Sequence, residues 1–225
     1  MKGLVLKDIF GVRFQILGAV AVMLLPLLML ILSGGAMAVD EETNVPAEIY
    51  VLIYGIVNYI SITLCSSFLV NTLGFDERSG WSKIQRTMPL SGGKIIGAKF
   101  LSMGLVLAAL TSLSLIINVI NALLFKIPLE PMITMPLCMC MVQAIALSPT
   151  FTLGYRFGAK TTSAAYIGFM VLLAAAMIAV VFMLFMGDIG ITALRIISYA
   201  GLPALTAAVV AVSWVTGKRT VNVDI

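Results

Sequence analysis

The segment Phe75-Asp76-Glu77-Arg78-Ser79-Gly80-Trp81-Ser82-Lys83-Ile84-Gln85-Arg86-Thr87-Met88-Pro89 is a charged stretch between two long apolar runs. The chain around it is strongly apolar, since 61% of its 225 residues are hydrophobic and only 11% are charged. A soluble domain carries about 25% charged residues. The composition therefore predicts a membrane protein in which this segment belongs to the largest part exposed to water.

Six apolar runs are long enough to cross about 30 Å of hydrocarbon. No Asp, Glu, Lys or Arg falls inside any of them. Because a helix satisfies its own backbone hydrogen bonds in lipid, we expect an all-α membrane protein with six transmembrane helices. The expected spans are 14–32, 49–73, 100–124, 132–153, 163–186 and 196–215.

The basic residues predict the orientation of these spans. Twelve of the 14 Lys and Arg residues lie before the first span, between spans two and three, between spans four and five, or after the last. Only Lys126 and Arg195 lie on the other side. The other side is acidic and carries Asp40, Glu41, Glu42, Glu48, Glu130 and Asp188. The positive-inside rule therefore predicts that both termini are cytosolic.

The first fourteen residues are predicted to form an amphipathic helix in the inner headgroup layer. Its apolar residues share one face and its charged residues are expected to point towards water. The apolar set is Leu4, Ile9, Phe10 and Phe14, and the charged set is Lys2, Lys7, Asp8 and Arg13. A plain basic flank that anchors the first span is the alternative. The segment also resembles a signal peptide with a site at Ala36-Met37-Ala38, but its apolar run exceeds the usual 7–15 residues or so.

The inner loop 74–99 is predicted to hold a short cytosolic helix. Trp81, Ile84 and Met88 fall at positions i, i+3 and i+7 and form one apolar stripe. Pro89 disfavours helical geometry at the residue before it and so ends the element. The alternative is an amphipathic helix that rests on the membrane surface without a partner.

Most catalytic chemistry is disfavoured by the residues present. The chain has no histidine, so the commonest general base and zinc ligand are missing. Ser91-Gly92-Gly93-Lys94 is not a phosphate loop, because that motif needs an earlier glycine and a Ser or Thr after the lysine. If ATP drives this protein, another chain hydrolyses it. Soft sulfur ligands around Cys138 and Cys140 suit Cu(I), but we expect no metal site.

The chain resembles the ABC-2 type permeases of bacterial ABC exporters. The likeness covers the layout of the whole chain, residues 1–225, as a single transmembrane domain with its coupling loop at 74–99. It is densest in Asn71-Thr72-Leu73-Gly74-Phe75-Asp76-Glu77, Trp81-Ser82-Lys83, Thr87-Met88-Pro89-Leu90-Ser91 and Lys99. Within the family, the branch that exports phenol-soluble modulins, which are amphipathic toxin peptides, is the most similar.

This resemblance implies a permease that does no covalent chemistry and binds no cofactor, since ATP and magnesium belong to a separate ABC ATPase. It implies two ATPase copies, a permease homodimer or a pair with a sister permease, a lipid environment and no nucleic-acid partner. The expected location is the bacterial cell membrane, as a multi-pass protein. The coupling helix that contacts the ATPase is assigned to Asp76, Glu77, Arg78, Trp81, Lys83 and Arg86. Lys2, Lys7, Asp8 and Arg13 fall on the N-terminal interfacial helix.

The leading hypothesis is therefore the permease subunit of an ATP-driven exporter of amphipathic or hydrophobic peptides. The absence of charged residues from the spans favours this cargo, because a path without charged side chains binds ions poorly. A lipid or drug exporter, and a membrane immunity or sensor subunit that transports nothing, are the alternatives.

Overall fold

The computed structural model describes residues 2–11, 13–32, 47–81, 84, 91–125, 128–185 and 197–223. Regular structure in these ranges is entirely helical, as predicted. The elements are α1 (Lys2–Gly11), α2 (Arg13–Leu32), α3 (Ala47–Arg78), α5 (Gly92–Phe125), α6 (Leu129–Phe157), α7 (Ala159–Phe185), the π-helical turn η1 (Ile197–Gly201) and α9 (Leu202–Val223).

Each long helix overlaps one predicted span, but α3 and α5 continue well past the apolar runs. About 20 helical residues cross the hydrocarbon, so the 32 residues of α3 and the 34 residues of α5 extend beyond it. The predicted loop 74–99 is therefore helical at both flanks, where α3 runs to Arg78 and α5 begins at Gly92.

Four helical stretches in the described residues are long and apolar enough to cross a membrane. They are Ile56–Arg78, Gly92–Leu124, Leu129–Phe157 and Ser198–Thr220. The pair α1 and α2, bent by 53°, adds a fifth if it is one broken span, and Lys160–Leu173 of α7 is a shorter apolar helix. These stretches indicate a multi-pass membrane protein.

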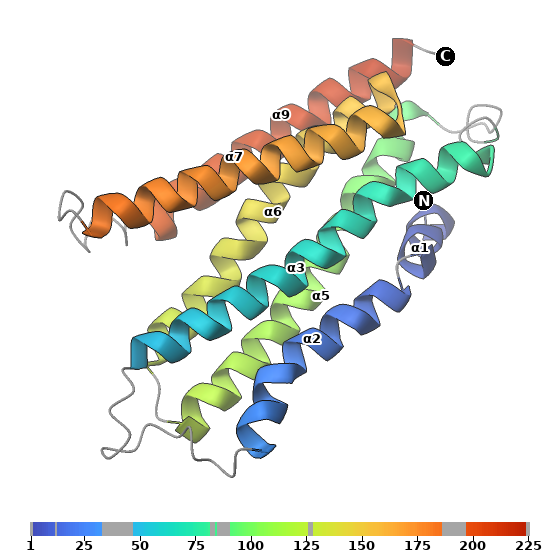
Figure 1. Ribbon diagram of the computed structural model, residues 1–225. Coiled ribbons are helices and arrows are strands. Elements are labelled where there is room, and N and C mark those ends of the chain that lie inside the picture. The colour runs from blue at the N-terminus through green and yellow to red at the C-terminus, as the bar shows by residue number, and fades with distance from the viewer. Residues whose placement is uncertain are drawn as a thin grey trace.

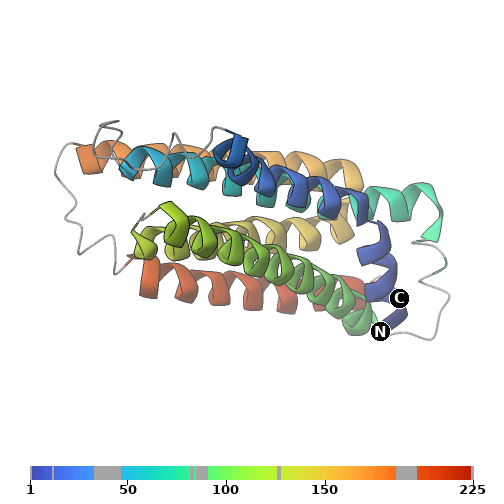
Figure 2. The ribbon, with the colours of Figure 1, turned by 90° about the horizontal axis from the view of Figure 1, so that it is seen from below.

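The helices pack around α6, which contacts α3, α5, α7 and α9. Figures 1 and 2 show α2 and α9 on opposite sides of the bundle. The Phe100 ring of α5 joins two neighbouring helices, with its centroid 6.4 Å from that of Phe151 and 5.8 Å from that of Trp214. The largest fully buried apolar side chains are Phe151, Ile62, Leu69, Ile96, Leu110, Met132 and Leu147.

Two glycines allow α6 and α9 to approach their neighbours closely. A Cβ atom at Gly154 would lie 2.3 Å from the Thr162 hydroxyl oxygen and 2.7 Å from a Leu73 methyl carbon. A Cβ atom at Gly217 would lie 2.9 Å from the Cδ1 atom of Ile96. Small residues at helix crossings are characteristic of membrane proteins, because backbones then pack at short range.

The segments predicted to share one side of the membrane meet at one end of the bundle, which we call the basic end. The Lys218 side chain of α9 lies against Gly93 at the start of α5, and the Glu77 carboxylate of α3 lies close to Gly158 between α6 and α7. Helix α1 packs on the same end of α5. Figures 1 and 2 accordingly show α1 and the last turn of α9 at the same end.

Candidate functional site

The candidate site lies at the basic end, where α3 and α5 flank the segment between them. Helix α3 stops at Arg78 because Gly80 adopts a left-handed conformation with φ +71°, which a glycine tolerates at a helix C-terminus. Helix α5 starts after Ser91, whose carbonyl accepts hydrogen bonds from the backbone N–H groups of Lys94 and Ile95. The two helix ends bring residues from both flanks of this segment into contact.

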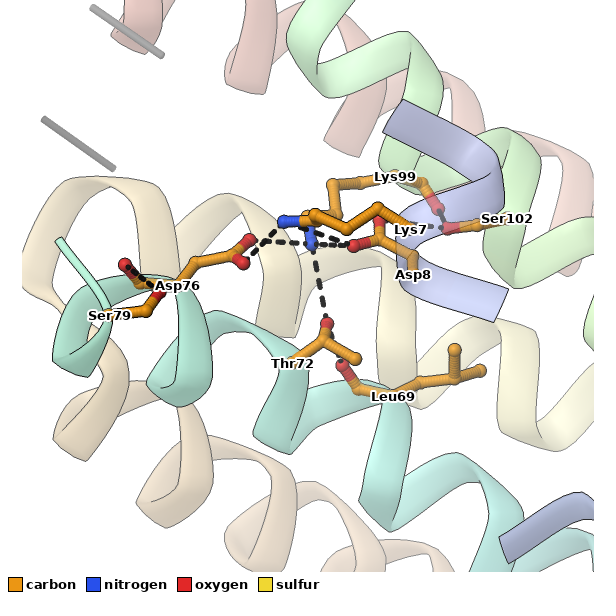
Figure 3. Close-up of polar contacts among 8 residues, drawn as sticks. All are labelled: Lys7, Asp8, Leu69, Thr72, Asp76, Ser79, Lys99 and Ser102. Atoms are coloured by element: carbon orange, nitrogen blue, oxygen red, sulfur yellow. Dashed lines mark hydrogen bonds and ion pairs between the residues drawn. The ribbon is translucent and has the colours of Figure 1, made fainter. Parts of the chain in front are cut away.

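Lys99, in the second turn of α5, is the centre of a buried ionic cluster. Its ammonium group donates to the Asp8 carboxylate of α1 at 2.7 Å and to the Asp76 carboxylate of α3 at 3.0 Å. A third contact, at 3.4 Å, reaches the hydroxyl of Thr72. The Lys99 side chain is 3% exposed and that of Asp8 is 2% exposed. One lysine thus connects three helices, as Figure 3 shows.

Lys7 of α1 completes this cluster from its outer side. Its ammonium group pairs with the Asp76 carboxylate and lies 3.6 Å from the Asp8 carboxylate. The same group lies 5.0 Å from the centroid of the Trp81 ring, within reach of a cation–π interaction. We call Lys7, Asp8, Asp76 and Lys99 the ionic cluster.

The ionic cluster contains two positive and two negative side chains and is formally neutral. Moving one ion out of water costs several kcal/mol, and a buried group is tolerated only when opposite charges and hydrogen bonds surround it. That condition is met here, because Ser102 also donates to Asp8, at 3.5 Å, and Thr72 is held by its own bond to the Leu69 carbonyl at 2.7 Å. The arrangement suits a rigid junction between helices.

Apolar side chains pack beside the ionic cluster and attach α1 to the same junction. Leu4 and Val5 of α1 are buried against Ala98 of α5, with Ile9 and Trp81 packed against them. Helix α1 is therefore held by both charge and apolar contact at the point where the segment between α3 and α5 begins and ends.

The residues predicted to form the coupling helix have different environments. Asp76 is buried in the ionic cluster and Trp81 is half-buried against α1. Glu77 and Arg78 are exposed at the end of α3. Lys83 and Arg86 lie outside the described residues, as do most positions of the predicted coupling helix. Contact of any of these residues with an ATPase stays a prediction.

Two expectations for the N-terminal segment are wrong: Leu4 is buried while Phe10 and Phe14 are exposed, so the four apolar residues do not share one face, and Asp8 does not point towards water. Asp8 is buried because Lys99 and Lys7 surround its carboxylate, and the face of α1 that carries it packs on α5. Lys7 lies at the rim with 32% of its side chain exposed, and Arg13 is exposed. The side chain of Lys2 is outside the described set.

Sequence reasoning did not assign Thr72, Lys99 and Ser102 to a site. Lys99 was considered only as one of the basic residues between spans two and three and as part of the motif that resembles ABC-2 permeases. A signal was present, because a lysine directly beside an apolar run needs an acidic partner when it is buried. Asp8, Asp76 and Glu77 were the acidic residues of the two neighbouring segments predicted on the same side, and the structure pairs Lys99 with the first two.

A second polar group lies deeper, between α3, α5, α6 and α7. Asn58 donates to Asn118 at 3.2 Å, and Asn118 donates to the Met132 carbonyl at 3.1 Å. Gln143 receives a hydrogen bond from the Tyr166 hydroxyl at 3.1 Å. These bonds join spans to each other, which is the role expected for polar side chains inside a membrane bundle.

An open apolar groove of about 590 Å³ lies between α6 and α9. Its lining is Met141, Pro203, Thr206, Ala207, Val210, Ala211, Trp214 and Val215. A groove of this kind offers hydrophobic contact and almost no hydrogen bonding, so it suits an apolar chain. Within the described part of the chain, no cluster of three or more His, Cys, Asp or Glu side chains has metal-binding geometry.

Comparison with known families gives a match along almost the whole chain. A family model described as ABC-2 family transporter protein matches residues 3–219. Among curated proteins and among solved structures, no significant match is found.

Proposed function

This chain belongs to the ABC-2 family of transporter proteins, and from that membership we propose that it is the transmembrane permease subunit of an ATP-driven exporter. In this proposal the chain does no covalent chemistry. A separate ABC ATPase, present in two copies, binds ATP and magnesium and drives the change of shape. The permease forms a homodimer or pairs with a sister permease in the bacterial cell membrane.

The proposed membrane layout has six spans with the basic end in the cytosol. Support comes from the charges, since the basic segments gather at one end and the positive-inside rule favours the cytosol for them. Further support comes from the six long helices α2, α3, α5, α6, α7 and α9, which overlap the apolar runs. Helix α1 then lies at the cytosolic headgroup level.

The ionic cluster is the proposed connection between the motor and the spans. Asp76 and Lys99 lie near the two ends of the predicted coupling loop 74–99, and the contact between their side chains, at 3.0 Å, joins those ends. This single contact is the observation that carries the proposed coupling role. In this proposal, a movement of the ATPase that displaces residues 82–90 displaces α3 and α5 together. It also displaces α1, because Asp8 pairs with Lys99 and Lys7 pairs with Asp76.

The proposed cargo is an amphipathic or hydrophobic peptide, as in the phenol-soluble modulin exporters that the sequence resembles. Two observations support an apolar cargo over an ion. The predicted spans contain no charged residue, and the groove between α6 and α9 is lined almost wholly by apolar side chains. A peptide that enters from the inner leaflet meets such a surface without losing much of its hydrophobic contact.

The experiment is copurification of the chain with its ATPase, followed by two classes of variant. Alanine at Trp81, Lys83 and Arg86 is expected to weaken the complex and to abolish transport-stimulated ATP turnover. Lys99→Met is expected to preserve the complex and still lower the stimulation, because it breaks transmission and not docking. Arg219→Ala is the control for loss of an exposed charge.

If the triple alanine variant keeps both the complex and the stimulated ATP turnover, the coupling assignment is wrong. If no ATPase copurifies with the wild-type chain in mild detergent, the permease proposal itself fails, and a subunit that transports nothing becomes the better interpretation.

A further inference from the structure

The α1–α2 elbow has an outward face that differs sharply from its inward face. Leu6, Phe10, Phe14 and Leu17 are all exposed, and Phe14 is 68% exposed. Within α1, Leu6 and Phe10 lie opposite the buried face that carries Leu4, Val5 and Asp8. Across the 53° bend the exposed row continues to Phe14 of α2, because the Arg13 side chain lies over both the Phe10 and the Phe14 rings. Four exposed large apolar side chains in one row indicate contact with lipid, not water.

Arg13 lies in the middle of this apolar row. Its guanidinium carbon is 4.8 Å from the centroid of the Phe14 ring and 5.9 Å from that of Phe10. Among the described residues it has no carboxylate within ion-pair distance, and Asp8, the nearest acid in sequence, is already paired with Lys99 and Lys7. The guanidinium is thus an uncompensated positive charge on rings that hold it against the elbow.

We propose that Arg13 binds the phosphate of an anionic phospholipid of the cytosolic leaflet, whose acyl chains cover Phe14 and Leu17. The inference rests on the membrane layout of the proposed function. A planar guanidinium recognises phosphate through two parallel hydrogen bonds. A soluble phosphate would neutralise the Arg13 guanidinium but would leave the exposed apolar side chains in water. A phospholipid binds the guanidinium through its phosphate and covers the apolar side chains with its acyl chains, so it is the occupant that fits the whole face.

The bound lipid stabilises the bend between α1 and α2 on its outward face, whereas the ionic cluster stabilises α1 on its inward face. Asp8, on the inner face of α1, is fixed by Lys99, while Arg13, just after the bend, is fixed by the lipid. The lipid composition of the inner leaflet then controls how firmly α1 is held against α3 and α5.

Native mass spectrometry of the full chain tests this site with defined lipids. The protein is equilibrated in mild detergent with equal amounts of phosphatidylglycerol and phosphatidylcholine, and the lipid retained per chain is counted. We expect the wild type to retain phosphatidylglycerol preferentially and Arg13→Gln to lower that retention about tenfold, as for loss of one charge-assisted contact. Arg13→Lys, which keeps the charge without the planar group, is expected to fall between them.

Arg219→Gln is the matched control, since it removes an exposed cation from the end of α9 and is expected to retain lipid normally. Equal retention by Arg13→Gln and the wild type overturns the proposal, as does equal loss in both variants. Displacement by millimolar inorganic phosphate overturns the lipid as occupant, and equal retention of phosphatidylcholine overturns the preference for an anionic headgroup. If Arg13→Gln does not fold, the Arg13→Lys variant decides. Phosphatidylglycerol retention by Arg13→Lys equal to that of the wild type would then overturn the proposal.

The ATPase plays no part in this measurement. A chain that retains phosphatidylglycerol through Arg13 but copurifies with no ATPase supports the lipid site and contradicts only the permease proposal.

Discussion

Replacing Lys99 with methionine removes the centre of the ionic cluster while keeping most of the side-chain volume. The Asp8 and Asp76 carboxylates, held by Lys99 at 2.7 Å and 3.0 Å, then share only Lys7. Breaking a buried pair in this way costs about 3–5 kcal/mol, because a charge is left uncompensated in a poorly solvated place. We expect that cost to appear mainly as detachment of α1, which contributes Asp8 and Lys7 to the ionic cluster.

Hydrogen–deuterium exchange of the purified chain measures this detachment directly. A cost of about 3 kcal/mol raises the opening equilibrium constant about 100-fold, since each 1.4 kcal/mol or so is a factor of ten. Amide exchange in α1 is therefore expected to accelerate by about that factor, while exchange in the middle of α6 changes little. Lys94→Met, an exposed lysine on the same helix, is the control and is expected to stay within about 0.5 kcal/mol of wild type.

The double variant Asp8→Leu with Lys99→Met separates the ionic explanation from simple loss of packing. It leaves Lys7 and Asp76 paired and replaces the buried ions with apolar groups, an exchange that is often neutral or stabilising. Exchange in α1 should return towards the wild-type rate. If Lys99→Met accelerates exchange no more than Lys94→Met does, the ionic cluster does not hold α1 and the reasoning is refuted.

Three further substitutions probe the packing that positions the site, each read out by thermal denaturation in detergent. Gly154→Ala is expected to cost about 1–3 kcal/mol, because its Cβ atom overlaps neighbouring side chains, whereas Gly104→Ala, with open space around it, is the neutral control; equal midpoints for the two would contradict the close approach. Gln143→Leu breaks hydrogen bonds to α3 and to Tyr166, and a double-mutant cycle with Tyr166→Phe should give a coupling energy of about 0.6 kcal/mol; a coupling of zero would show that the bond adds nothing. Gly80→Ala is expected to cost about 1–2 kcal/mol because of the positive φ at that position, and Gly80→Asn should recover part of the loss; an unchanged Gly80→Ala midpoint would mean that the turn is not needed.

The helical class and the places of the long helices were predictable from hydropathy, because only apolar runs of span length are stable in lipid. The predicted run 100–124 lies inside α5, and 132–153 lies inside α6. The gathering of the basic segments at one end also followed from sequence, since the charges of their loops are sorted by side.

The ionic cluster was not predictable from any single segment. Asp8, Asp76 and Lys99 are far apart in sequence, and each was interpreted on its own helix, as a water-facing residue, a docking residue and a basic flank. What brings them together is the folding of α1 back onto α5, which depends on tertiary contacts of Leu4 and Val5 with Ala98. Helix periodicity identifies a face but not the partner that covers it.

The helical extensions of α3 and α5 were also missed, for a related reason. Hydropathy marks where lipid ends, not where a helix ends, and Gly74–Arg78 and Gly92–Lys99 continue as helices outside the apolar runs. The sequence alone also did not indicate that α3 ends at a positive φ on Gly80.

The side of the membrane on which the ionic cluster lies is the central claim, and thiol labelling in intact cells measures it. The three native cysteines are first changed to serine. One variant then carries a single cysteine in place of the exposed Ser79, near the ionic cluster. A second variant carries it in place of Glu130, at the end of α6 that lies away from the basic end. With a membrane-impermeant maleimide, we predict that position 130 is labelled in intact cells and that position 79 is labelled only after permeabilisation. Labelling of position 79 from outside intact cells would place the ionic cluster away from any cytosolic motor and contradict the account.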